Sequence, residues 1–431
     1  MTHNAKQPAP LSVGLFTQGW PPEKMANGVT TYVATMARAL RAAGVGCQVI
    51  SAEQRDPAAK PDPLVHVLDR DNHSLLAKVM WRLRPEMWLH RSHGTALLGE
   101  VRRLHRERAI DLIEMEESFG WPRYLVGRCP VPLIVRLHGP WFLNGTANGA
   151  VEDAEFAKRE QWERAAIEGA DAITAPSRHV LDSVRRRYGI ALPGAEVIPN
   201  PVEPVEAADR WNLQACDRNR IVFVGRFDRH KGGDTMIEAF ARIARQRPDV
   251  HLDFIGPDRG CQEPDGRKIT IEQYLRDKLG EAERARVTYH GFLPASAAAE
   301  FRKRALVTVA PSRYETFGIA AAEAMMAGCP LVVGAAGAQT DMIQDGQNGL
   351  TAVPGDPADL ADKVLALLND PAHAATLGQR AAADAAERYA PDRVARQTIE
   401  FYRRVLAGAR RLAKSGSQKS AAPPRAASVS V

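Results

Sequence analysis

Short apolar, β-branched runs alternate with amphipathic segments along this chain, and the alternation begins twice. Such alternation is typical of parallel βαβ layers, in which each helix carries the chain back across the sheet. The first series predicts strands at residues 11–17, 110–115, 133–137, 172–175 and 196–198. The second series predicts strands at residues 221–224, 252–255, 287–289, 306–309 and 331–333. Helices are expected over residues 30–43, where Gly44 ends the helix, and over 234–245 and 318–327. We therefore expect an α/β protein with two doubly wound parallel sheets.

The length of 431 residues also favours two domains. A polar stretch at residues 203–218 separates the two series and is interpreted as a linker, with a hinge near residue 205. The predicted divisions are a flexible N-terminus at 1–10, a first domain at 11–205, a second at 206–390, an arginine-rich helix at 391–414 and a disordered tail at 415–431.

Composition excludes several classes of protein. The longest apolar stretch, residues 318–338, is interrupted by Glu323 and Pro330, which argues against a bilayer span. The first ten residues lack the features of a secretory leader, and five scattered cysteines indicate free thiols in a reducing cytoplasm. A net charge of +6 is too small to indicate nucleic-acid binding.

The densest group of polar and small residues lies at 311–328. Glu315 precedes Gly318, where a strand is expected to end in a tight loop and a helix to begin with free N–H groups, an arrangement that favours phosphate. Glu323 follows about 7.5 Å along the helix axis, at about 1.5 Å per residue. The order acid, anion site, acid matches the order sugar, diphosphate, ribose in a nucleotide sugar. The bland alternative is that both glutamates are solvated charges at a helix start.

A second group, residues 225–233, follows the first strand of the second domain. Ligands bind at the carboxyl ends of parallel strands, so Arg226 and Lys231 are expected to face the same crevice as Glu315. Two cations there would neutralise a departing diphosphate. The alternative is a solvated basic turn, for which Arg229 is a good candidate.

Three weaker signals lie in the first domain. His138 ends a predicted strand and suggests a polar contact to the reacting sugar, although a lone histidine is more often structural. Gly28 precedes the first long helix and would let backbone approach a substrate. Asp69-Arg70-Asp71 has the form of a metal-binding DxD, but it lies in a polar connector and is interpreted as solvated charge, and no other group has metal-ligand spacing.

Together these motifs resemble the donor half of a retaining glycosyltransferase of family 4 with the GT-B fold. Besides Glu315 and Glu323, the resemblance is carried by Gly225-Arg226, Lys231-Gly232, Ile255-Gly256, His290-Gly291-Phe292 and Gly328-Cys329-Pro330. The similarity runs from about residue 11 to about residue 406.

The resemblance implies two Rossmann-like domains that face each other across a cleft, with the donor held by the second and the acceptor by the first. Arg226 and Lys231 would hold the diphosphate, Glu315 the transferred sugar and Glu323 the ribose. Phe317, Gly318 and Ile319 would offer backbone N–H groups, with Thr316 beside them as a further substrate-binding residue, and His138 would lie near the sugar. The family needs no metal ion, and its final helix crosses back to the first domain. Two departures, Asn27-Gly28 in place of paired glycines and Gly46-Cys47 in place of Gly-His, bear on the acceptor.

Residues 78–108 hold eight Lys or Arg against three acids, with Trp81 and Trp88 among them. This pattern suits an anionic membrane surface and equally suits a solvated basic face.

We therefore expect a metal-independent, retaining hexosyltransferase in the cytoplasm, with peripheral membrane attachment as one option. It would use a UDP- or GDP-sugar donor and a glycan or lipid-linked glycan acceptor, in cell-surface polysaccharide synthesis. The rivals are a catalytically silent nucleotide-sugar-binding partner and an epimerase or phosphorylase on the same fold.

Overall fold

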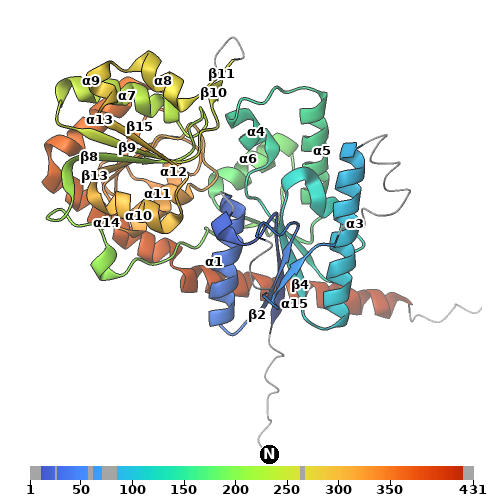
Figure 1. Ribbon diagram of the computed structural model, residues 1–431. Coiled ribbons are helices and arrows are strands. Elements are labelled where there is room, and N and C mark those ends of the chain that lie inside the picture. The colour runs from blue at the N-terminus through green and yellow to red at the C-terminus, as the bar shows by residue number, and fades with distance from the viewer. Residues whose placement is uncertain (1–10, 25–26, 57–61, 70–84, 263–266, 421–431) are drawn as a thin grey trace, which may run out of the picture.

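Two parallel sheets, each covered by helices, form two lobes (Figure 1). The computed structural model describes residues 11–24, 27–56, 62–69, 85–262 and 267–420. The expected α/β class with two parallel sheets is confirmed. The expected N-terminal segment 1–10 lies outside the described residues.

The first sheet has the strand order β3-β2-β1-β4-β5-β6-β7, and every neighbouring pair is parallel. The order reverses at β1, so the sheet is doubly wound. Its strands are β1 (Ser12–Thr17), β2 (Gly46–Ser51), β3 (Val65–Val67), β4 (Leu112–Glu116), β5 (Leu133–Arg136), β6 (Ala172–Ala175) and β7 (Glu196–Val197).

The second sheet repeats this plan with the order β12-β9-β8-β13-β14-β15. Its first strand, β8, starts at Asp217, so the last two residues of the expected linker, 203–218, belong to the strand. The strands are β8 (Asp217–Val224), β9 (His251–Ile255), β12 (Val287–Gly291), β13 (Ala305–Ala310), β14 (Leu331–Gly334) and β15 (Leu350–Ala352); β10 (Cys261–Gln262) and β11 (Lys268–Ile269) form a separate antiparallel hairpin.

Helices cover both faces of both sheets (Figure 1). Those of the first lobe are α1 (Gly28–Ala42), α3 (Pro85–Arg106), α4 (Trp141–Ala147), α5 (Ala154–Glu168) and α6 (Arg178–Tyr188), with 3₁₀ turns η1 (Pro22–Lys24) and η2 (Ser118–Tyr124). Those that follow are η3 (Ala207–Asp209), α7 (Gly233–Gln246), α8 (Ile271–Lys278), α9 (Glu281–Arg284), α10 (Ala295–Arg304), α11 (Ile319–Met326), α12 (Gln339–Met342), α13 (Pro357–Asn369), α14 (Pro371–Tyr389) and α15 (Pro391–Ser420).

The ends of α1 show why the helix forms where it does. The Asn27 side chain accepts a hydrogen bond from the backbone N–H of Val29, which satisfies one of the free donors of the first turn. At the other end Gly44 has a φ of 78°, a left-handed conformation that glycine adopts without a steric penalty. Gly44 therefore turns the chain into β2.

Helix α15 returns from the second lobe and passes beneath the first sheet and α1 (Figure 1). Val394, Ile399 and Tyr402 are buried in the same apolar cluster as Tyr32 and Leu40 of α1. The hydroxyls of Tyr32 and Tyr402 both donate to the buried Glu114 carboxylate, at 2.6 and 3.0 Å. The last segment of the chain thus contributes to the core of the first lobe.

The end of α15 corrects one expectation. The helix continues to Ser420, whereas the sequence places its end at residue 414 and disorder from residue 415. The first proline after Pro391 is Pro423, so residues 415–420 contain no proline that would end the helix. Residues 421–431 lie outside the described part.

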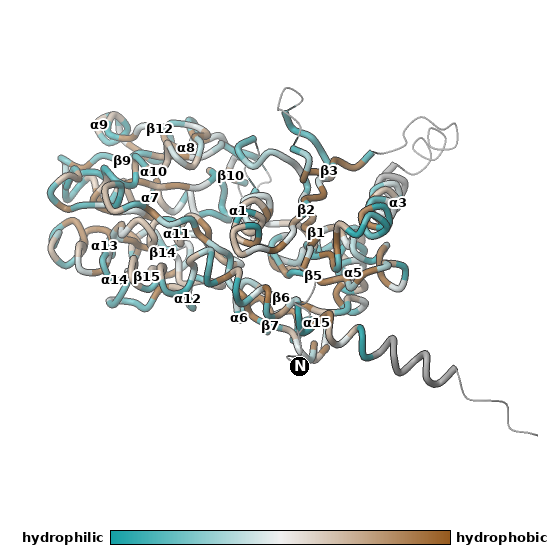
Figure 2. The backbone as a smooth tube through the Cα atoms, turned by 90° about the horizontal axis from the view of Figure 1, so that it is seen from below, coloured by the Kyte–Doolittle hydropathy of each residue, from teal (hydrophilic) through white to brown (hydrophobic). Residues whose placement is uncertain are grey.

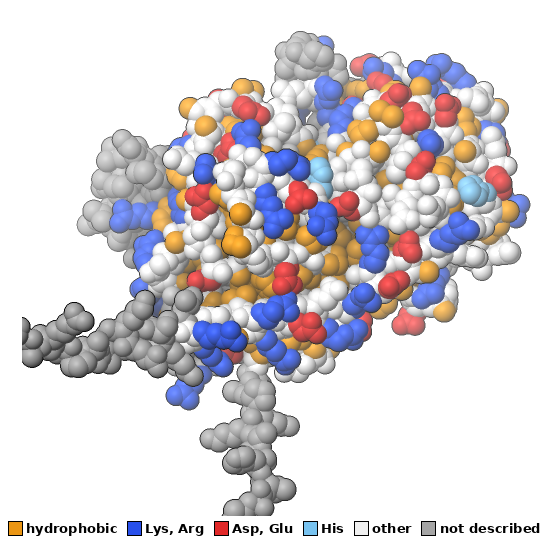
Figure 3. Space-filling model, turned by 180° about the vertical axis from the view of Figure 1, so that it is seen from behind, with side chains coloured by type: hydrophobic (Ala, Val, Ile, Leu, Met, Phe, Trp, Pro, Cys, Tyr) orange, Lys and Arg blue, Asp and Glu red, His pale blue; other side chains and the backbone are white. Residues whose placement is uncertain are grey.

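The junction of the lobes is basic on one side. In the tube view, α6, β7, α12 and α15 lie along one edge of the molecule (Figure 2). From behind, Lys and Arg side chains surround an apolar hollow between the two lobes (Figure 3). Ser177, which caps α6, donates a hydrogen bond from Oγ to the Thr316 carbonyl at 2.9 Å, so a direct contact joins the lobes here.

Candidate active site

The loop between β13 and α11 is packed tightly against the start of α7. Gly232 has a φ of 71°, and a Cβ there would lie 2.2 Å from the carbonyl oxygen of Pro311. A larger residue would push the two segments apart. Arg313 then clamps the loop to α7, because its Nη1 and Nη2 contact the two carboxylate oxygens of Asp234 at 2.7 and 2.8 Å.

Glu315 and Lys231 meet at the centre of this loop. Lys231 Nζ lies 2.6 Å from Glu315 Oε1, and Ser312 Oγ donates to the same oxygen at 2.7 Å. The Glu315 side chain is only 13% exposed. Burial by itself would raise the pKa of Glu315, but the Lys231 ammonium outweighs burial and lowers that pKa. Glu315 is therefore a fixed carboxylate that can accept hydrogen bonds.

Arg226 lies beside this pair and reaches across to the first lobe. Its Nε lies 2.8 Å from Asp228 Oδ2, and its Nη2 lies 3.4 Å from Asn148 Oδ1. Asn148 Oδ1 also lies 3.0 Å from His230 Nδ1. The carboxyl-end crevice predicted for Arg226 and Lys231 thus contains two further polar side chains, His230 and Asn148.

His230 is buried and has a defined role in the loop. Its Nε2 lies 2.8 Å from the Tyr314 carbonyl, which can only accept, so Nε2 carries the proton. Burial, followed by the Lys231 charge, lowers the pKa of His230 and favours the neutral ring. The sequence prediction omitted this histidine, although it stands next to Lys231 within the motif.

The residues after Glu315 line the junction of the lobes. Thr316 accepts from Ser177, and a Cβ on Gly139 would lie 2.8 Å from Thr316 Cγ2. Phe317 is buried, and Gly318 has a φ of 90° where α11 begins. Ile319 meets the start of α1, since a Cβ on Gly28 would lie 3.3 Å from Ile319 Cδ1. The structure therefore brings the predicted Gly28 and the segment 316–319 together.

His138 follows β5 on the opposite wall. The backbone N–H groups of His138 and Gly139 donate to the two oxygens of Glu117, at 2.8 and 2.7 Å, and the ring packs edge-on against Tyr32. Burial, followed by the Arg136 charge, lowers the pKa of His138 well below its ordinary value. His138 is therefore a neutral group whose loop is held by Glu117, a residue the sequence prediction did not include.

Glu323 lies apart from the Lys231 and Glu315 pair. On α11 its Oε2 forms an ion pair with Arg302 Nη1 at 2.9 Å, and 29% of the side chain is exposed. Arg302 itself is buried. The exposed part of Glu323 can still accept from a hydroxyl, while Arg302 holds the carboxylate in place.

The first lobe presents a cation between two aromatic rings. The guanidinium carbon of Arg159 lies 3.8 Å from the ring centre of Trp141 and 4.1 Å from that of Phe119, and Nε lies 3.0 Å from Glu163. Burial raises the pKa of the neighbouring Glu116 to about 7 and that of Glu117 to about 8. No sequence motif pointed to this cluster.

The remaining predictions fall outside this region. Asp69 is exposed, and the rest of the DxD lies outside the described residues. Trp81 and the side chain of Trp88 are not among those described either. Within the described part of the chain no three His, Cys, Asp or Glu side chains are grouped as for a metal ion, and no helix is long and apolar enough to cross a bilayer.

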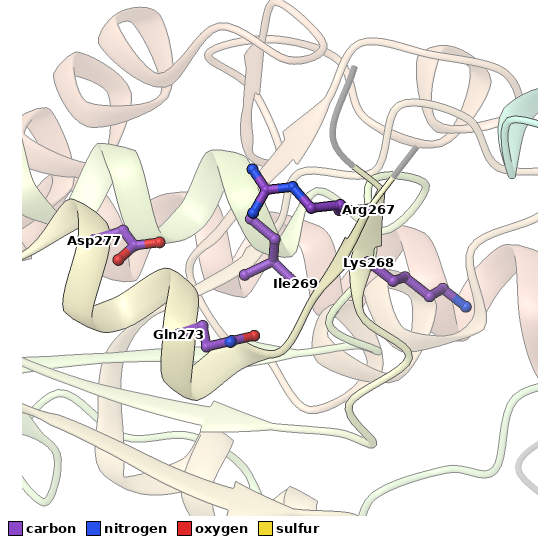
Figure 4. A pocket seen from close by; sticks show the side chains of 5 residues that line it. All are labelled: Arg267, Lys268, Ile269, Gln273 and Asp277. Atoms are coloured by element: carbon purple, nitrogen blue, oxygen red, sulfur yellow. The ribbon is translucent and has the colours of Figure 1, made fainter. Parts of the chain in front are cut away.

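A separate hollow of about 300 Å³ lies beside the β10–β11 hairpin. Figure 4 shows Asp277 and Gln273 of α8 beside Arg267 and Ile269, while Lys268 points away. It shares no residue with the Lys231 and Glu315 cluster, so it is not part of the candidate active site.

Each of the two lobes matches the model of a known protein family. The model of Glycosyltransferase Family 4 matches residues 26–206, and that of glycosyl transferases group 1 matches residues 206–384. A D-inositol 3-phosphate glycosyltransferase of Paenarthrobacter aurescens is 27% identical over 400 residues, which are 89% of this chain and 94% of that protein. An alpha-D-kanosaminyltransferase of Streptomyces kanamyceticus is 28% identical over 296 residues, 65% of this chain and 73% of that one.

Solved structures agree on the fold. Sucrose-phosphate synthase from Thermosynechococcus elongatus superposes with a TM-score of 0.70 at 22% identity, covering 92% of this chain and 100% of that one. Anabaena HepE in complex with UDP and glucose superposes with a TM-score of 0.63 at 18% identity, covering 90% of this chain and 98% of that one. The predicted resemblance is confirmed: this chain belongs to glycosyltransferase family 4, is a glycosyltransferase and has the GT-B fold.

Proposed function

We propose that this glycosyltransferase moves a hexose, with retention of anomeric configuration, from a UDP- or GDP-sugar to a glycan or lipid-linked glycan acceptor. The observation that carries the proposal is the buried Glu315 carboxylate, paired with Lys231 at 2.6 Å and followed by a loop that contacts the first lobe at Ser177, Gly139 and Gly28. The wall proposed for the donor therefore meets the wall proposed for the acceptor in the segment that follows this carboxylate. UDP bound to Anabaena HepE favours a uridine donor.

The charges suggest how the donor is held. Lys231 and Arg226 would bind the diphosphate, and the backbone N–H groups of residues 317–319, at the start of α11, would add neutral donors. Glu315 would accept hydrogen bonds from hydroxyls of the sugar, and Glu323 from those of the ribose. These cations would also stabilise the negative charge that builds on the leaving phosphate.

The proposed reaction uses the leaving group as the base. The bond between the anomeric carbon and the phosphate oxygen breaks, the acceptor oxygen bonds to that carbon on the same face, and its proton passes to the departing phosphate. His138, neutral near neutral pH, would donate or accept a hydrogen bond at the sugar without competing for the phosphate as a cation. We propose that no metal ion is required, because Arg226 and Lys231 supply the positive charge.

The acceptor has a second candidate, a phosphorylated cyclitol. The relative from Paenarthrobacter aurescens is named for D-inositol 3-phosphate. In this chain the first lobe holds Arg159 between Trp141 and Phe119 with 22% of its side chain exposed, and a guanidinium in that position can bind an acceptor phosphate. The glycan acceptor and a role in cell-surface polysaccharide synthesis are the broader proposal.

Donor binding can be tested by thermal unfolding with UDP, GDP, ADP and their sugar conjugates. A ligand that binds the folded protein raises the unfolding midpoint, and we expect the largest shift with one UDP-sugar. Glu323→Ala should reduce that shift, whereas Glu300→Ala, on the exposed side of the neighbouring α10, should not. Absence of any shift with a folded wild type would contradict the donor assignment.

Product analysis separates the rival activities. Release of UDP that depends on an added acceptor indicates transfer, whereas conversion of the donor without acceptor would favour an epimerase, and dependence on phosphate a phosphorylase. Nucleotide-sugar binding without turnover, over a panel of glycans and inositol phosphates, would favour the silent partner. We also propose a cytoplasmic location with peripheral membrane attachment through residues 78–108, which flotation with anionic vesicles, using Trp81→Ala and Trp88→Ala, tests.

A further inference from the structure

A cavity of about 310 Å³ lies at the junction of the two lobes, and neither Lys231 nor Glu315 lines it. Its walls come from α6, the segment after β7, the loop before α11, and the start of α15, which include Arg178, Pro199, Phe317 and Arg393. Of these elements, α6 and α15 lie along the edge described above (Figure 2). The cavity is therefore lined by both lobes.

Three arginines line this cavity against a single acid, Asp341. Arg388 is fixed, because its Nη2 donates to the Asp341 carbonyl at 2.9 Å. Arg178 and Arg393 are exposed, and in the described part of the chain neither side chain forms a hydrogen bond or ion pair. Two guanidinium groups from different helices thus remain available to an anion.

The other walls indicate what kind of anion fits. Phe317, Met342 and Tyr389 supply apolar surface, and Ser177 and Gln397 add polar groups. Cavities that hold small molecules begin at about 300 Å³ and combine an apolar lining with a few polar anchors. Arginine forks match the geometry of phosphate oxygens. The volume suits a phosphorylated sugar or a molecule of similar size.

We propose that this cavity binds a small phosphorylated metabolite through Arg178, Arg388 and Arg393, and that binding favours the observed arrangement of the lobes. A ligand here contacts the first lobe at Pro176 and the second at Phe317, so it binds best when both walls are in place. Such a ligand shifts the equilibrium between the joined and the separated lobes only as far as it binds the joined lobes more tightly. The effect reaches the donor site through Phe317, which follows Thr316 directly. The inference holds whichever donor and acceptor the enzyme uses.

Calorimetric titration of the full chain with glucose 6-phosphate, with inorganic phosphate and with glucose tests the binding. We expect glucose 6-phosphate to bind more tightly than phosphate, and glucose not to bind. The variant Arg178→Ala/Arg393→Ala should weaken binding at least about 10-fold, since each arginine contact to phosphate is charge-assisted. Arg396→Ala is the matched control, because Arg396 lies on the same helix and is paired with Asp392. Both altered residues are exposed, so the double variant should fold, which its unfolding midpoint verifies.

Lys231→Ala separates this cavity from the donor site. If glucose 6-phosphate still binds Lys231→Ala, the ligand does not need the donor diphosphate site. Binding lost in Lys231→Ala but kept in the double arginine variant would overturn the proposal, as would absence of binding to the wild type. The effect on the lobes is read from hydrogen exchange in residues 198–206. Exchange should slow on ligand binding to the wild type and not in the double variant, and an unchanged rate in the ligand-bound wild type would overturn the coupling.

Discussion

At the scale of single residues, the site depends on one charge pair in a confined space. Glu315 is mostly enclosed, and its carboxylate is kept ionised by Lys231 and Ser312. An enclosed ion pair contributes less to stability than its geometry suggests, because both charges lose hydration. Its value here lies in presenting a fixed acceptor to the sugar before the donor arrives.

We expect Glu315→Gln to lower turnover by roughly 100-fold, the size of effect seen when one fixed electrostatic contact to a transition state is lost. Glutamine keeps the volume but leaves the Lys231 ammonium without its carboxylate, so the unfolding midpoint should also fall, and turnover is compared at a temperature where both proteins are folded. The check is product formation at saturating donor, with Glu300→Gln as a surface control on α10. Equal turnover in wild type and Glu315→Gln would remove Glu315 from the reacting site.

Two histidines give stability a defined pH dependence. The pKa values of His138 and His230 are lowered in the folded protein by burial, so the unfolded chain takes up their protons more readily. Their contribution to the free energy of unfolding is therefore complete above about pH 6.5, the ordinary histidine pKa, and is lost as the pH falls below it. We expect the unfolding midpoint of His138→Gln to fall less between pH 7.5 and 5.5 than that of the wild type. The exposed His373→Gln is the control, and an equal fall in all three proteins would contradict the assignment.

At the scale of elements, strands and helices with strong patterns were predicted well, and those supported mainly by tertiary contacts were not. The strand at 172–175 and the helix that became α7 stand close to their predicted bounds. Strands β2, β3 and β15 were missed. The strands β3 and β15 have three residues each, and β2 starts at Gly46 and contains the polar Gln48, so all three depend on their neighbours in the sheet.

The candidate site shows the same division. Glu315, Lys231 and Arg226 could be predicted, since their motifs follow strands of the second sheet directly. Asn148, Ser177 and Arg159 could not, because their significance comes from contacts with residues far away in the chain: Asn148 meets His230, and Ser177 meets Thr316. No local spacing encodes contacts between lobes.

Helix α15 offers a test of how the chain end supports the first lobe. Tyr402→Phe removes one of the two hydroxyls that donate to the buried Glu114 carboxylate. Its oxygen Oε2 then loses the hydrogen bond from Tyr402. We expect a loss of about 1 to 2 kcal/mol in the free energy of unfolding, measured by denaturant titration. Arg403→Ala, an exposed neighbour on the same helix, should change it by less than about 0.5 kcal/mol. Adding Tyr32→Phe should cost less than the sum of the single changes, since both hydroxyls serve one carboxylate.

At the scale of the whole molecule, the two lobes meet through few polar contacts around the reacting loop. Ser177 donates a hydrogen bond to the carbonyl of Thr316, and Asn148, which directly follows α4, reaches Arg226 and His230 of the second lobe. The basic cavity behind the same loop adds a place where a ligand can act on the same junction. The arrangement of the lobes and the geometry of the donor site are therefore coupled through one short segment.

Asn148→Ala tests this coupling directly. Asn148 is exposed, so its loss should leave the unfolding midpoint unchanged while it frees the lobes to separate. If the contact contributes about 1 kcal/mol to the joined arrangement, the equilibrium constant shifts about 5-fold, and turnover should fall by up to about 5-fold because a smaller fraction of the molecules is competent to react. Small-angle scattering should then report a larger radius of gyration for the free variant than for the free wild type. Thr146→Ala, an exposed change on α4 two residues before Asn148, should alter neither quantity. If the variant loses turnover without any change in scattering, Asn148 does not hold the lobes together. Its role would then be local, in positioning Arg226 and His230 or in contacting the substrate.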